Sequence, residues 1–380
     1  MKKIAILGST GHVGRKVLEV VSEHKNEFKI TGLSANENYR LLLSQAKEFG
    51  VEKLALRNEN LKNQIREEGF KIYYGPFAWR NLIDESLDVV IIAITGIDAV
   101  YPLLYALQKG INVALASKEA LIAGGELINC QFRDSKSKII PLDSEHNAIF
   151  QIIQNLDRSE ISAIYLTCSG GPFLEYSRSQ LEMVTPEMAV SHPRWKMGKK
   201  ISVDSATLLN KGFEIIEAYY LFQLHPEKIK VLIHPQAIVH GMVELNDGNI
   251  FAHMAVTDMK VPIAYALGYP LRLDSGLKLN WQKPLNLEFF IPDSDKFPAL
   301  RIAYFCLENR KSYPAYLAKL DDILVDEFLQ GRIKFPSILE IIEEAIKTHT
   351  PREVKTLDDL YQIFAEAEHT VNTLLPEVSK

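Results

Sequence analysis

The sequence has few cysteines, no long apolar run and no excess of basic residues. Its three cysteines, Cys130, Cys168 and Cys306, are too few and too scattered for a disulfide framework or a thiolate metal site. No apolar run approaches the ~20 residues that span a bilayer, and the N-terminus lacks the charged and apolar regions of a signal peptide. We therefore expect a cytoplasmic protein without a membrane partner.

The charge balance excludes another class of partner. The net charge is -5 and the pI is about 6.1, whereas proteins that bind nucleic acids or membrane surfaces in general need a basic face. Any anion must therefore be bound by a local group of residues. With 380 residues, 47% of them hydrophobic and 24% charged, the chain is long enough for two or three globular domains.

The first residues follow the pattern of strand, glycine turn and helix. Residues 3–7 are a short apolar strand, residues 8–14 read GSTGHVG, and Val17, Leu18 and Val21 recur at helical spacing. Glycines at this spacing allow a tight turn and let the backbone approach a pyrophosphate. A turn without a ligand is the alternative for an isolated motif, but the strand and helix around it favour a dinucleotide site.

The first part of the chain alternates strand and helix patterns, which predicts a doubly wound, mostly parallel α/β sheet. The further strands are expected at residues 29–33, 54–56, 88–94, 112–116 and 138–142, with helices at 39–49 and 99–109. Residues 89–94 are apolar without a period of two, so this strand should be covered on both faces. Ser117-Lys118-Glu119 and Asp143-Ser144-Glu145 each follow a strand, where open parallel sheets bind ligands.

The carboxylates of Asp143 and Glu145 predict a metal site. On extended backbone two residues two apart point to the same side, with Ser144 pointing away or donating through its hydroxyl. Oxygen ligands favour Mg²⁺ or Mn²⁺ over zinc, and Glu214 would be a third carboxylate if the two segments meet. A polar loop with capping residues is the alternative for this motif alone.

The stretch from residue 192 to residue 217, HPRWKMGKKISVDSATLLNKGFEIIE, is the densest in reactive side chains. A helix starting near Ser205 would bury a stripe of apolar residues and place polar residues on another face. The apolar stripe is Leu209, Phe213, Ile216 and Tyr220, and the polar face is Asn210, Lys211 and Glu214. Ser202, Asp204 and Ser205 are possible N-caps, so the helix start and Lys211 together predict a phosphate site.

Two further segments carry candidate substrate contacts. A strand over residues 163–167 ends in CSGGPF, where Ser169 offers a hydroxyl to a phosphate or substrate oxygen, although a simple turn remains an alternative. The polar span 185–198 is punctuated by Pro and Gly and carries Trp195. We interpret this span as a lid that closes over the substrate and expels water.

Together these motifs resemble the 1-deoxy-D-xylulose 5-phosphate reductoisomerase family. The resemblance rests on GSTGHVG, LASKEALIAGGEL, PLDSEHNAIFQ, LTCSGGPF, HPRWKMGKKISVDSATLLNKGFEIIEA, IHPQAIVHGMVELNDG and TDMKVPIAYAL, in family order. It implies isomerisation and NADPH-dependent reduction of 1-deoxy-D-xylulose 5-phosphate to 2-C-methyl-D-erythritol 4-phosphate, for isoprenoid biosynthesis, with Mg²⁺ or Mn²⁺. It also implies a homodimer formed through the catalytic domain.

The resemblance assigns roles to individual residues. The implied metal ligands are Asp143, Glu145 and Glu214. The implied substrate contacts are Lys118, Ser144, Glu145, Ser169, His192, Trp195, Ser205, Asn210, Lys211 and Glu214. The implied catalytic set is Lys118, Asp143, Glu145, His192 and Glu214. The implied cofactor contacts are Thr10, Gly11, His12, Val13, Asn38, Ser117, Glu119 and Gly198.

At one position the residues favour a different cofactor from the one that the resemblance implies. Asn36, Glu37 and Asn38 follow the second strand, where a dinucleotide fold meets the adenosine ribose, and an acidic residue there favours NADH. The family uses NADPH. We hypothesise that NADPH is used with a smaller margin over NADH than the resemblance implies, with Arg40 or Arg57 as a counter-charge to the phosphate, and that Glu37→Lys widens the margin.

The rest of the chain predicts a linker and a helical bundle. Residues 271–297 are rich in Pro, Asp and Asn, and helical patterns follow at 301–307, 315–329, 337–347 and 357–375. We expect a dinucleotide-binding domain over 1–142, an α/β catalytic and dimerisation domain over 143–270, the linker over 271–297 and a helical domain over 298–380. Two other functions stay open at this point: a metal-assisted NAD(P)-dependent hydroxy-acid or semialdehyde dehydrogenase, and a nucleotide-binding regulator without turnover.

Overall fold

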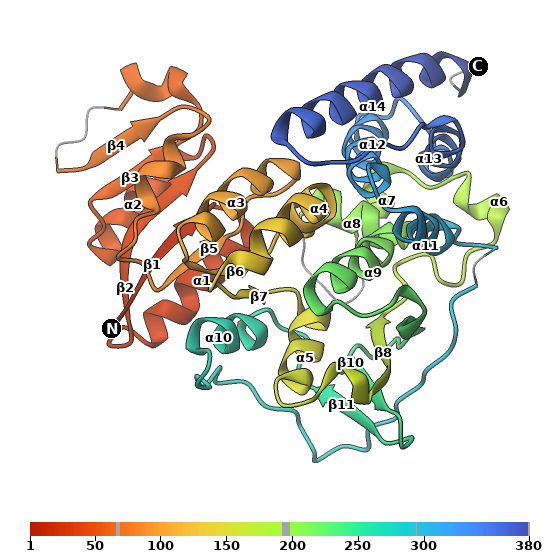
Figure 1. Cartoon of the computed structure of the whole chain (residues 1–380), viewed down its shortest axis with the longest axis horizontal. Coiled ribbons are helices and arrows are strands. Elements are labelled where there is room, and N and C mark those ends of the chain that lie inside the picture. Colours follow the sequence, from red (N-terminus) through yellow and green to blue (C-terminus); the bar gives the residue numbers. More distant parts are fainter. Residues whose placement is uncertain (66–68, 192–197, 294, 379–380) are drawn as a thin grey trace. The chain divides into compact units, whose positions relative to one another are not determined.

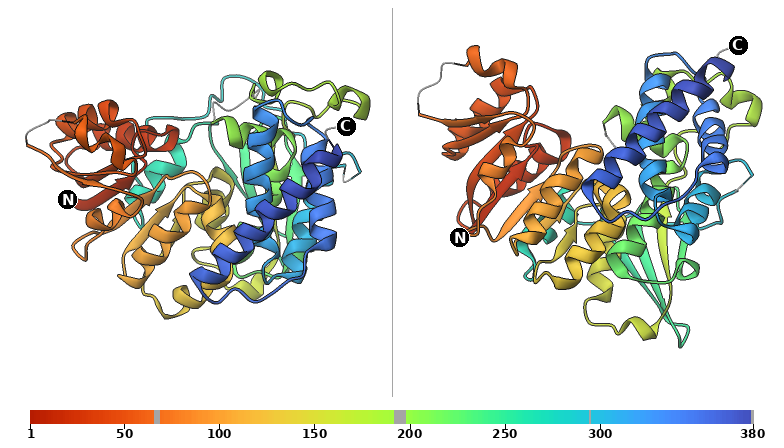
Figure 2. Two further views of the ribbon diagram at one scale, coloured as in Figure 1. Left: turned by 90° about the horizontal axis from the view of Figure 1, so that it is seen from above. Right: turned by 45° about the horizontal axis from the view of Figure 1, so that its top comes forward.

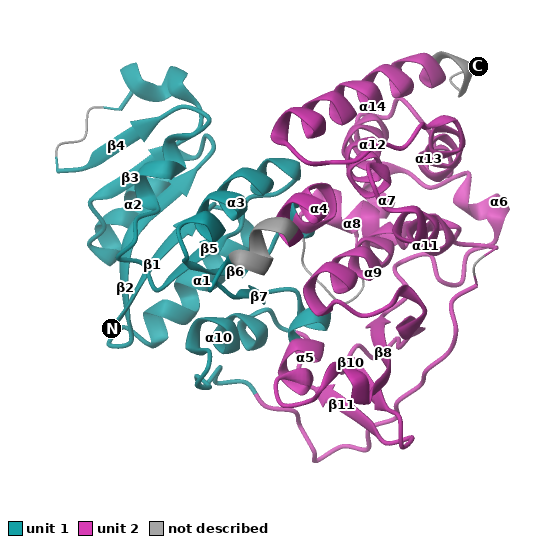
Figure 3. Cartoon of the chain, viewed as in Figure 1, with its two compact units in different colours: residues 1–120, 130–147, 258–277 teal, residues 121–129, 148–257, 278–380 magenta. Residues whose placement is uncertain are grey.

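The computed structural model describes residues 1–65, 69–191, 198–293 and 295–378, which form two compact units (Figure 3). Unit 1 comprises residues 1–120, 130–147 and 258–277. Unit 2 comprises residues 121–129, 148–257 and 278–380. None of the described helices is long and apolar enough to cross a membrane.

Unit 1 is built on a seven-stranded sheet in the order β4-β3-β2-β1-β5-β6-β7, and every neighbouring pair is parallel (Figure 1). The strands are β1 (Lys2–Leu7), β2 (Phe28–Ala35), β3 (Lys53–Leu56), β4 (Lys71–Tyr74), β5 (Val89–Ile92), β6 (Asn112–Leu115) and β7 (Ile139–Pro141). Val90, Ile91 and Ile92 have no exposed surface, as expected for an interior strand covered on both faces. The predicted doubly wound parallel sheet is confirmed.

Helices α1 (His12–Glu23), α2 (Tyr39–Phe49), α3 (Val100–Gln108) and α4 (Lys118–Asp134) connect these strands. Unit 1 also holds both ends of α4, the start of α5 (Ser144–Ile153), which follows β7, and α10 (Lys260–Gly268), which comes later in the chain. Short 3₁₀ turns lie at η1 (Glu59–Asn63), η2 (Ala78–Leu82) and η3 (Ile97–Ala99). Asn38 caps the start of α2, where its Oδ1 accepts the Leu41 N–H at 3.2 Å, and Gly50 caps its end with a φ of 65°, which suits glycine.

Unit 2 contains a four-stranded sheet in the order β11-β10-β8-β9. Its strands are β8 (Ile161–Cys168), β9 (Ile229–Ile233), β10 (Val239–Leu245) and β11 (Ile250–Met254). Only the β8–β9 pair is parallel among these strands, and β11 is an edge strand. The same unit holds η4 (Arg158–Glu160), α6 (Arg178–Leu181), α7 (Pro186–Ala189), α8 (Lys199–Ala206), α9 (Leu209–Phe222) and η5 (Pro226–Lys228).

The C-terminal part of unit 2 is a helical bundle (Figure 2), in which α12 packs against the three other helices of the bundle. The helices are α11 (Ala299–Asn309), α12 (Tyr313–Leu329), α13 (Ser337–Thr348) and α14 (Leu357–Val378). Each begins within two residues of its predicted start, because apolar residues such as Ile338, Ile342 and Ile346 recur at helical spacing and are buried. The predicted bundle is confirmed.

The bundle encloses a buried histidine, His349. Its Nδ1 lies 2.7 Å from Glu366 Oε1, its Nε2 lies 2.8 Å from Ser312 Oγ, and its ring stacks on Tyr316 at 4.0 Å between centroids. Burial lowers the pKa of His349, and the Glu366 carboxylate opposes that shift only in part. The neutral imidazole is therefore the form that fits the folded bundle.

We expect His349 to make the bundle less stable in mild acid. Since its pKa is lower in the folded state, the unfolded chain binds more protons, so stability falls as pH drops below about 6.5, the ordinary histidine value. Thermal unfolding between pH 7.5 and pH 5 should show a shallower decline for His349→Gln than for wild type. The exposed His225 is the matched control, since His225→Gln should keep the wild-type slope. Equal slopes for His349→Gln and wild type would contradict this account.

Candidate active site

The glycine turn after β1 is packed too tightly for side chains at two of its positions. Gly8 has a φ of 88°, and a Cβ on it would lie 2.5 Å from the Ala93 carbonyl oxygen. A Cβ on Gly14 would lie 2.2 Å from the Gly8 oxygen, so α1 can begin against the strand only with glycine there. Gly11 is the N-cap of α1 and no side chain caps it, which suits a helix start that receives a phosphate.

The predicted cofactor contacts Thr10, Gly11, His12 and Val13 lie in this turn and the first turn of α1. Burial, followed by the nearby cations Arg15 and Lys16, lowers the pKa of His12. His12 is therefore neutral at pH 7 and adds no positive charge of its own to the turn. The helix start and these two cations remain to attract a pyrophosphate.

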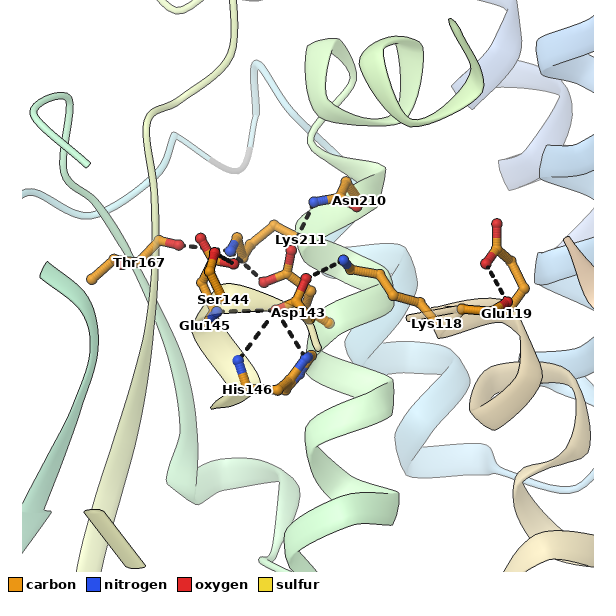
Figure 4. Close-up of polar contacts among 11 residues, drawn as sticks. Lys118, Glu119, Asp143, Ser144, Glu145, His146, Thr167, Asn210 and Lys211 are labelled. Atoms are coloured by element: carbon orange, nitrogen blue, oxygen red, sulfur yellow. Dashed lines mark hydrogen bonds and ion pairs between the residues drawn. The ribbon is translucent and has the colours of Figure 1, made fainter. Parts of the chain in front are cut away.

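The segments that follow β6 and β7 are brought together, as their positions at neighbouring strand ends predict. The Lys118 ammonium, at the start of α4, donates to Asp143 Oδ2 (Figure 4), and both side chains are 9% exposed. Ser117 Oγ donates to Glu119 Oε2 at 3.0 Å and to the Gly96 carbonyl oxygen at 3.3 Å. Lys118 and Asp143 thus form a buried ion pair at the carboxyl edge of the sheet.

The backbone at Asp143–Glu145 differs from the prediction of extended structure. α5 begins at Ser144, and Asp143 Oδ1 accepts the N–H groups of Glu145 at 3.1 Å and His146 at 3.2 Å (Figure 4). Asp143 therefore serves as a helix cap, and Glu145 belongs to the first helical turn. Ser144 donates through its hydroxyl to Glu145 Oε2 at 2.8 Å, which is the second of the two predicted orientations.

His146 was missed by the sequence analysis. Its side chain is fully buried, and its Nδ1 lies 3.2 Å from Asp143 Oδ1. The only local signal was its position directly after the Asp-Ser-Glu motif at a helix start. This neighbour helps to fix the orientation of the Asp143 carboxylate.

The helix expected to start near Ser205 is two helices. α8 ends at Ala206 and α9 begins at Leu209, with Leu208 between them at a φ of 61°. The prediction of N-caps at Ser202, Asp204 and Ser205 is therefore wrong, because these residues lie inside α8. Gly198 is the N-cap of α8, and Ser202 Oγ donates to its carbonyl oxygen at 2.9 Å.

Helix α9 has the predicted apolar stripe, but its polar residues are not solvated. Lys211 is 3% exposed and Glu214 is 1% exposed, and the Lys211 ammonium donates to Glu214 Oε2. The same ammonium donates to the Thr167 carbonyl oxygen at 2.6 Å (Figure 4), while Asn210 Nδ2 donates to Glu214 Oε1 at 2.7 Å. Asn210, Lys211 and Glu214 therefore form one connected polar group at the end of β8.

The loop that carries Ser169 lies against the end of α8. Gly170 and Gly171 have positive φ values, and a Cβ on Gly171 would lie 2.6 Å from the Ser205 carbonyl oxygen. Among the described residues, the predicted substrate residues of unit 2 thus lie around the end of β8: Ser169, Ser205, Asn210, Lys211 and Glu214. His192 and Trp195 lie outside the residues that the structure describes.

A second group of buried charged residues was not predicted from the sequence. Lys200 Nζ donates to Asp204 Oδ2 at 2.9 Å and to Asp321 Oδ2 at 2.5 Å. Asp321, on α12, is fully buried, although the stretch around it carried no predicted functional residue. This ion pair joins α8 to the C-terminal bundle.

The parallel sheet, the glycine turn before α1 and the carboxylates at the strand ends define the class of dinucleotide-dependent oxidoreductases. Family profiles narrow this class: 1-deoxy-D-xylulose 5-phosphate reductoisomerase matches residues 4–125, and its two C-terminal domain profiles match residues 139–222 and 254–370. The chain belongs to the 1-deoxy-D-xylulose 5-phosphate reductoisomerase family. The resemblance stated from the motifs is confirmed.

Individual relatives cover nearly the whole chain. The 1-deoxy-D-xylulose 5-phosphate reductoisomerase of Caldanaerobacter subterraneus subsp. tengcongensis is 42% identical over 376 residues, covering 98% of each chain. The structure of the Zymomonas mobilis enzyme in complex with NADPH has a TM-score of 0.92 at 34% identity, covering 98% of this chain and 99% of that one. Another family structure, in complex with NADPH, fosmidomycin and magnesium, has a TM-score of 0.91 at 32% identity, covering 99% and 98%.

Proposed function

We propose that this chain isomerises 1-deoxy-D-xylulose 5-phosphate and reduces the product to 2-C-methyl-D-erythritol 4-phosphate, using NADPH and a divalent metal ion. The observation that carries the proposal is the match to family members over 98% of the chain. The solved relatives hold NADPH and magnesium, the cofactor and metal expected from the motifs. The reaction supplies a precursor for isoprenoid biosynthesis.

Three carboxylates are the proposed metal ligands: Asp143, Glu145 and Glu214, each of which offers one oxygen. A donor set made only of carboxylate oxygens fits Mg²⁺ or Mn²⁺ better than zinc. The capping bonds to Asp143 and the Ser144 hydroxyl on Glu145 orient these two side chains in advance of binding. Asn210 and Lys211 do the same for Glu214.

The glycine turn and α1 are the proposed site for the NADPH pyrophosphate, with Thr10, Gly11, His12 and Val13 as contacts. Gly11 fits this role because no side chain caps the helix start. Asn38, at the start of α2, is the proposed contact on the adenosine side. Ser117, Glu119 and Gly198 are the remaining proposed cofactor contacts.

The substrate phosphate is the proposed ligand of the polar group at the end of β8. Ser169, Ser205, Asn210 and Lys211 offer hydroxyl, amide and ammonium donors there, and His192 completes the set. We propose that Trp195 covers the bound substrate and excludes water. Ser144 and Lys118 are proposed contacts of the substrate hydroxyls.

The side chains of the protein do two things in this proposal. Lys118 donates to Asp143, and in the proposal it also contacts a substrate hydroxyl, with which it would exchange a proton. The polar group of unit 2 holds the phosphate, so both chemical stages occur on one anchored molecule. When bound, the metal ion polarises the substrate oxygens and NADPH supplies the reducing equivalent.

Steady-state oxidation of NADPH with 1-deoxy-D-xylulose 5-phosphate, followed by NMR of the product, tests the proposal. The expected product has the branched skeleton of 2-C-methyl-D-erythritol 4-phosphate. A reduced product with the unbranched skeleton would show a dehydrogenase instead. Absence of turnover with either nicotinamide cofactor and either metal would favour a nucleotide-binding regulator.

We also propose a separate function for each domain expected from the sequence. Residues 1–142 would bind the dinucleotide, 143–270 the metal and substrate, and 298–380 would support the site, with 271–297 as the linker. No helix or strand occurs between Tyr269 and Pro298 among the described residues, which supports a linker there. We also propose a cytoplasmic location, since the scarce cysteines fit a reducing compartment.

We further propose that the enzyme is a homodimer formed through β11. This strand is at the edge of its sheet and exposes Ile250 at 55% and Phe251 at 50%. An apolar edge strand offers unpaired backbone groups and apolar surface to another copy of the chain. Trp281 and Ile291, 70% and 81% exposed, add apolar surface from the same unit.

Sedimentation velocity should find a dimer for wild type and a monomer for Phe251→Asp. The introduced carboxylate would be buried without a partner in the dimer, which costs far more than the apolar contact it removes. Met183→Asp is the matched control, because Met183 is 68% exposed on another part of unit 2. A Phe251→Asp protein that stays dimeric would rule out β11 as the interface.

A further inference from the structure

An ion pair crosses the carboxyl edge of the unit 1 sheet. Arg57, directly after β3, pairs through its guanidinium with Asp98 Oδ2 in η3, which follows β5. In the sheet, β2 and β1 lie between β3 and β5. The side chains of Arg57 and Asp98 therefore meet across the ends of the two strands that frame the glycine turn.

Backbone contacts place this ion pair beside the turn. The Arg57 N–H donates to the Ala35 carbonyl oxygen at 3.1 Å, at the end of β2, and the Gly8 N–H donates to Ser34 at 3.1 Å. On the other side, Ala93 packs against Gly8 so closely that a Cβ would not fit. The segments that carry Arg57 and Asp98 thus lie on opposite sides of the turn, and the two side chains meet in the ion pair.

The same edge carries the segment that meets the adenosine ribose in dinucleotide folds, the residues just after the second strand. Here that segment contains Glu37, an exposed carboxylate. The Asn58 N–H donates to the Asn36 carbonyl oxygen at 3.1 Å, and Asn58 Nδ2 donates to Glu37 Oε1 at 3.4 Å. Arg57 is therefore next in the chain to Asn58, which contacts the ribose segment.

The charges at this edge favour NADH unless a cation turns toward the ribose. A phosphate monoester carries about -1.5 to -2 charges at pH 7, and Glu37 would repel it. The Arg57 guanidinium is 51% exposed and Asp98 41% exposed, so their ion pair is weak enough to exchange one anion for another. A guanidinium also binds a phosphate with two parallel hydrogen bonds.

We propose that Arg57 binds the 2′-phosphate of NADPH and that Asp98 competes with this phosphate for the guanidinium. Arg57 then compensates for Glu37, and Asp98 lowers the margin of NADPH over NADH. The inference rests on the proposed use of NADPH by this enzyme. It assigns cofactor selection to the ends of β3 and β5 in addition to the end of β2.

Calorimetric titration of the full-length enzyme with 2′,5′-ADP and with ADP tests this inference without turnover. Arg57→Gln should weaken 2′,5′-ADP binding by about 10- to 100-fold, the loss expected for a charge-assisted contact, and change ADP binding by less than about twofold. Asp98→Asn should strengthen 2′,5′-ADP binding several-fold, since it removes the competing carboxylate. Arg57→Lys should keep part of the affinity.

Arg301→Gln is the matched control. Arg301 pairs with Glu343 in an exposed ion pair on the C-terminal helices, and its loss should leave both dissociation constants within about twofold of wild type. A larger loss of 2′,5′-ADP binding in Arg40→Gln, the other candidate counter-charge, than in Arg57→Gln would overturn the inference. So would equal 2′,5′-ADP binding by Arg57→Gln and wild type.

The two proposals can fail separately. If wild type oxidises NADPH with 1-deoxy-D-xylulose 5-phosphate while Arg57→Gln binds 2′,5′-ADP normally, only the role of Arg57 is wrong. If wild type shows no NADPH oxidation and no preference for 2′,5′-ADP over ADP, the proposed function fails and the inference fails with it.

Discussion

Replacing Glu145 with glutamine is expected to reduce kcat by about a thousandfold or more while the enzyme stays folded. The proposed metal contributes several kcal/mol of charge stabilisation, and each 1.36 kcal/mol corresponds to about tenfold in rate. Glutamine keeps the shape of the side chain but loses the charge that holds a hard cation. Steady-state rates across a titration of Mg²⁺ and of Mn²⁺, with circular dichroism of the same samples, measure both effects.

Glu340→Gln is the control for this substitution. Glu340 also lies in the first turn of a helix, α13, but it is exposed on the C-terminal bundle, so its loss should change neither the rate nor the metal dependence. Near-normal activity of Glu145→Gln at low Mg²⁺ would show that Glu145 is not a metal ligand.

Replacing Lys211 with methionine is expected to damage stability and activity together. Lys211 and Glu214 are almost completely buried and bonded to each other, so methionine leaves a carboxylate without its ammonium partner. Removing one member of such a pair costs about 3 to 5 kcal/mol. Urea unfolding should therefore show a lower midpoint, and substrate affinity should fall because the proposed phosphate contact is lost.

The double variant Lys211→Met/Glu214→Gln separates the two effects. Because neither remaining side chain is charged, most of the stability should return, whereas turnover should stay lost without the Glu214 carboxylate. If the double variant were as unstable as Lys211→Met alone, the loss would come from altered packing and not from the unpaired charge.

The regular elements could be predicted because their causes are local. Apolar spacing located six of the seven strands of unit 1 and the helices of the C-terminal bundle to within a few residues, but β4 was not predicted. The break in the central helix could not be predicted, since Leu208 adopts a left-handed conformation without any glycine or proline to signal it. The start of α5 did have a signal, because Asp143 followed by Ser144 and Glu145 is also typical of a helix N-terminus.

The candidate site was predictable as a set of residue types and not as a set of contacts. Strand-end positions predicted that Lys118 and Asp143 would meet, because neighbouring parallel strands end at the same edge. The burial of Lys211 with Glu214 was not predicted, since helical spacing gives the shared face but not what covers it. Asp321 could not be found at all, because it is 121 residues from its partner Lys200.

The contact of Lys200 with Asp204 and Asp321 bears on how far the enzyme can be shortened by engineering. A gene truncated before α12 would remove Asp321 and open the surface of α8 that the bundle covers. Lys200 lies two positions after Gly198, so the damage would reach the start of the helix that follows the Trp195 segment. The C-terminal helices are therefore not a detachable module, and a minimal version of the enzyme would need a redesigned Lys200–Asp204 pair.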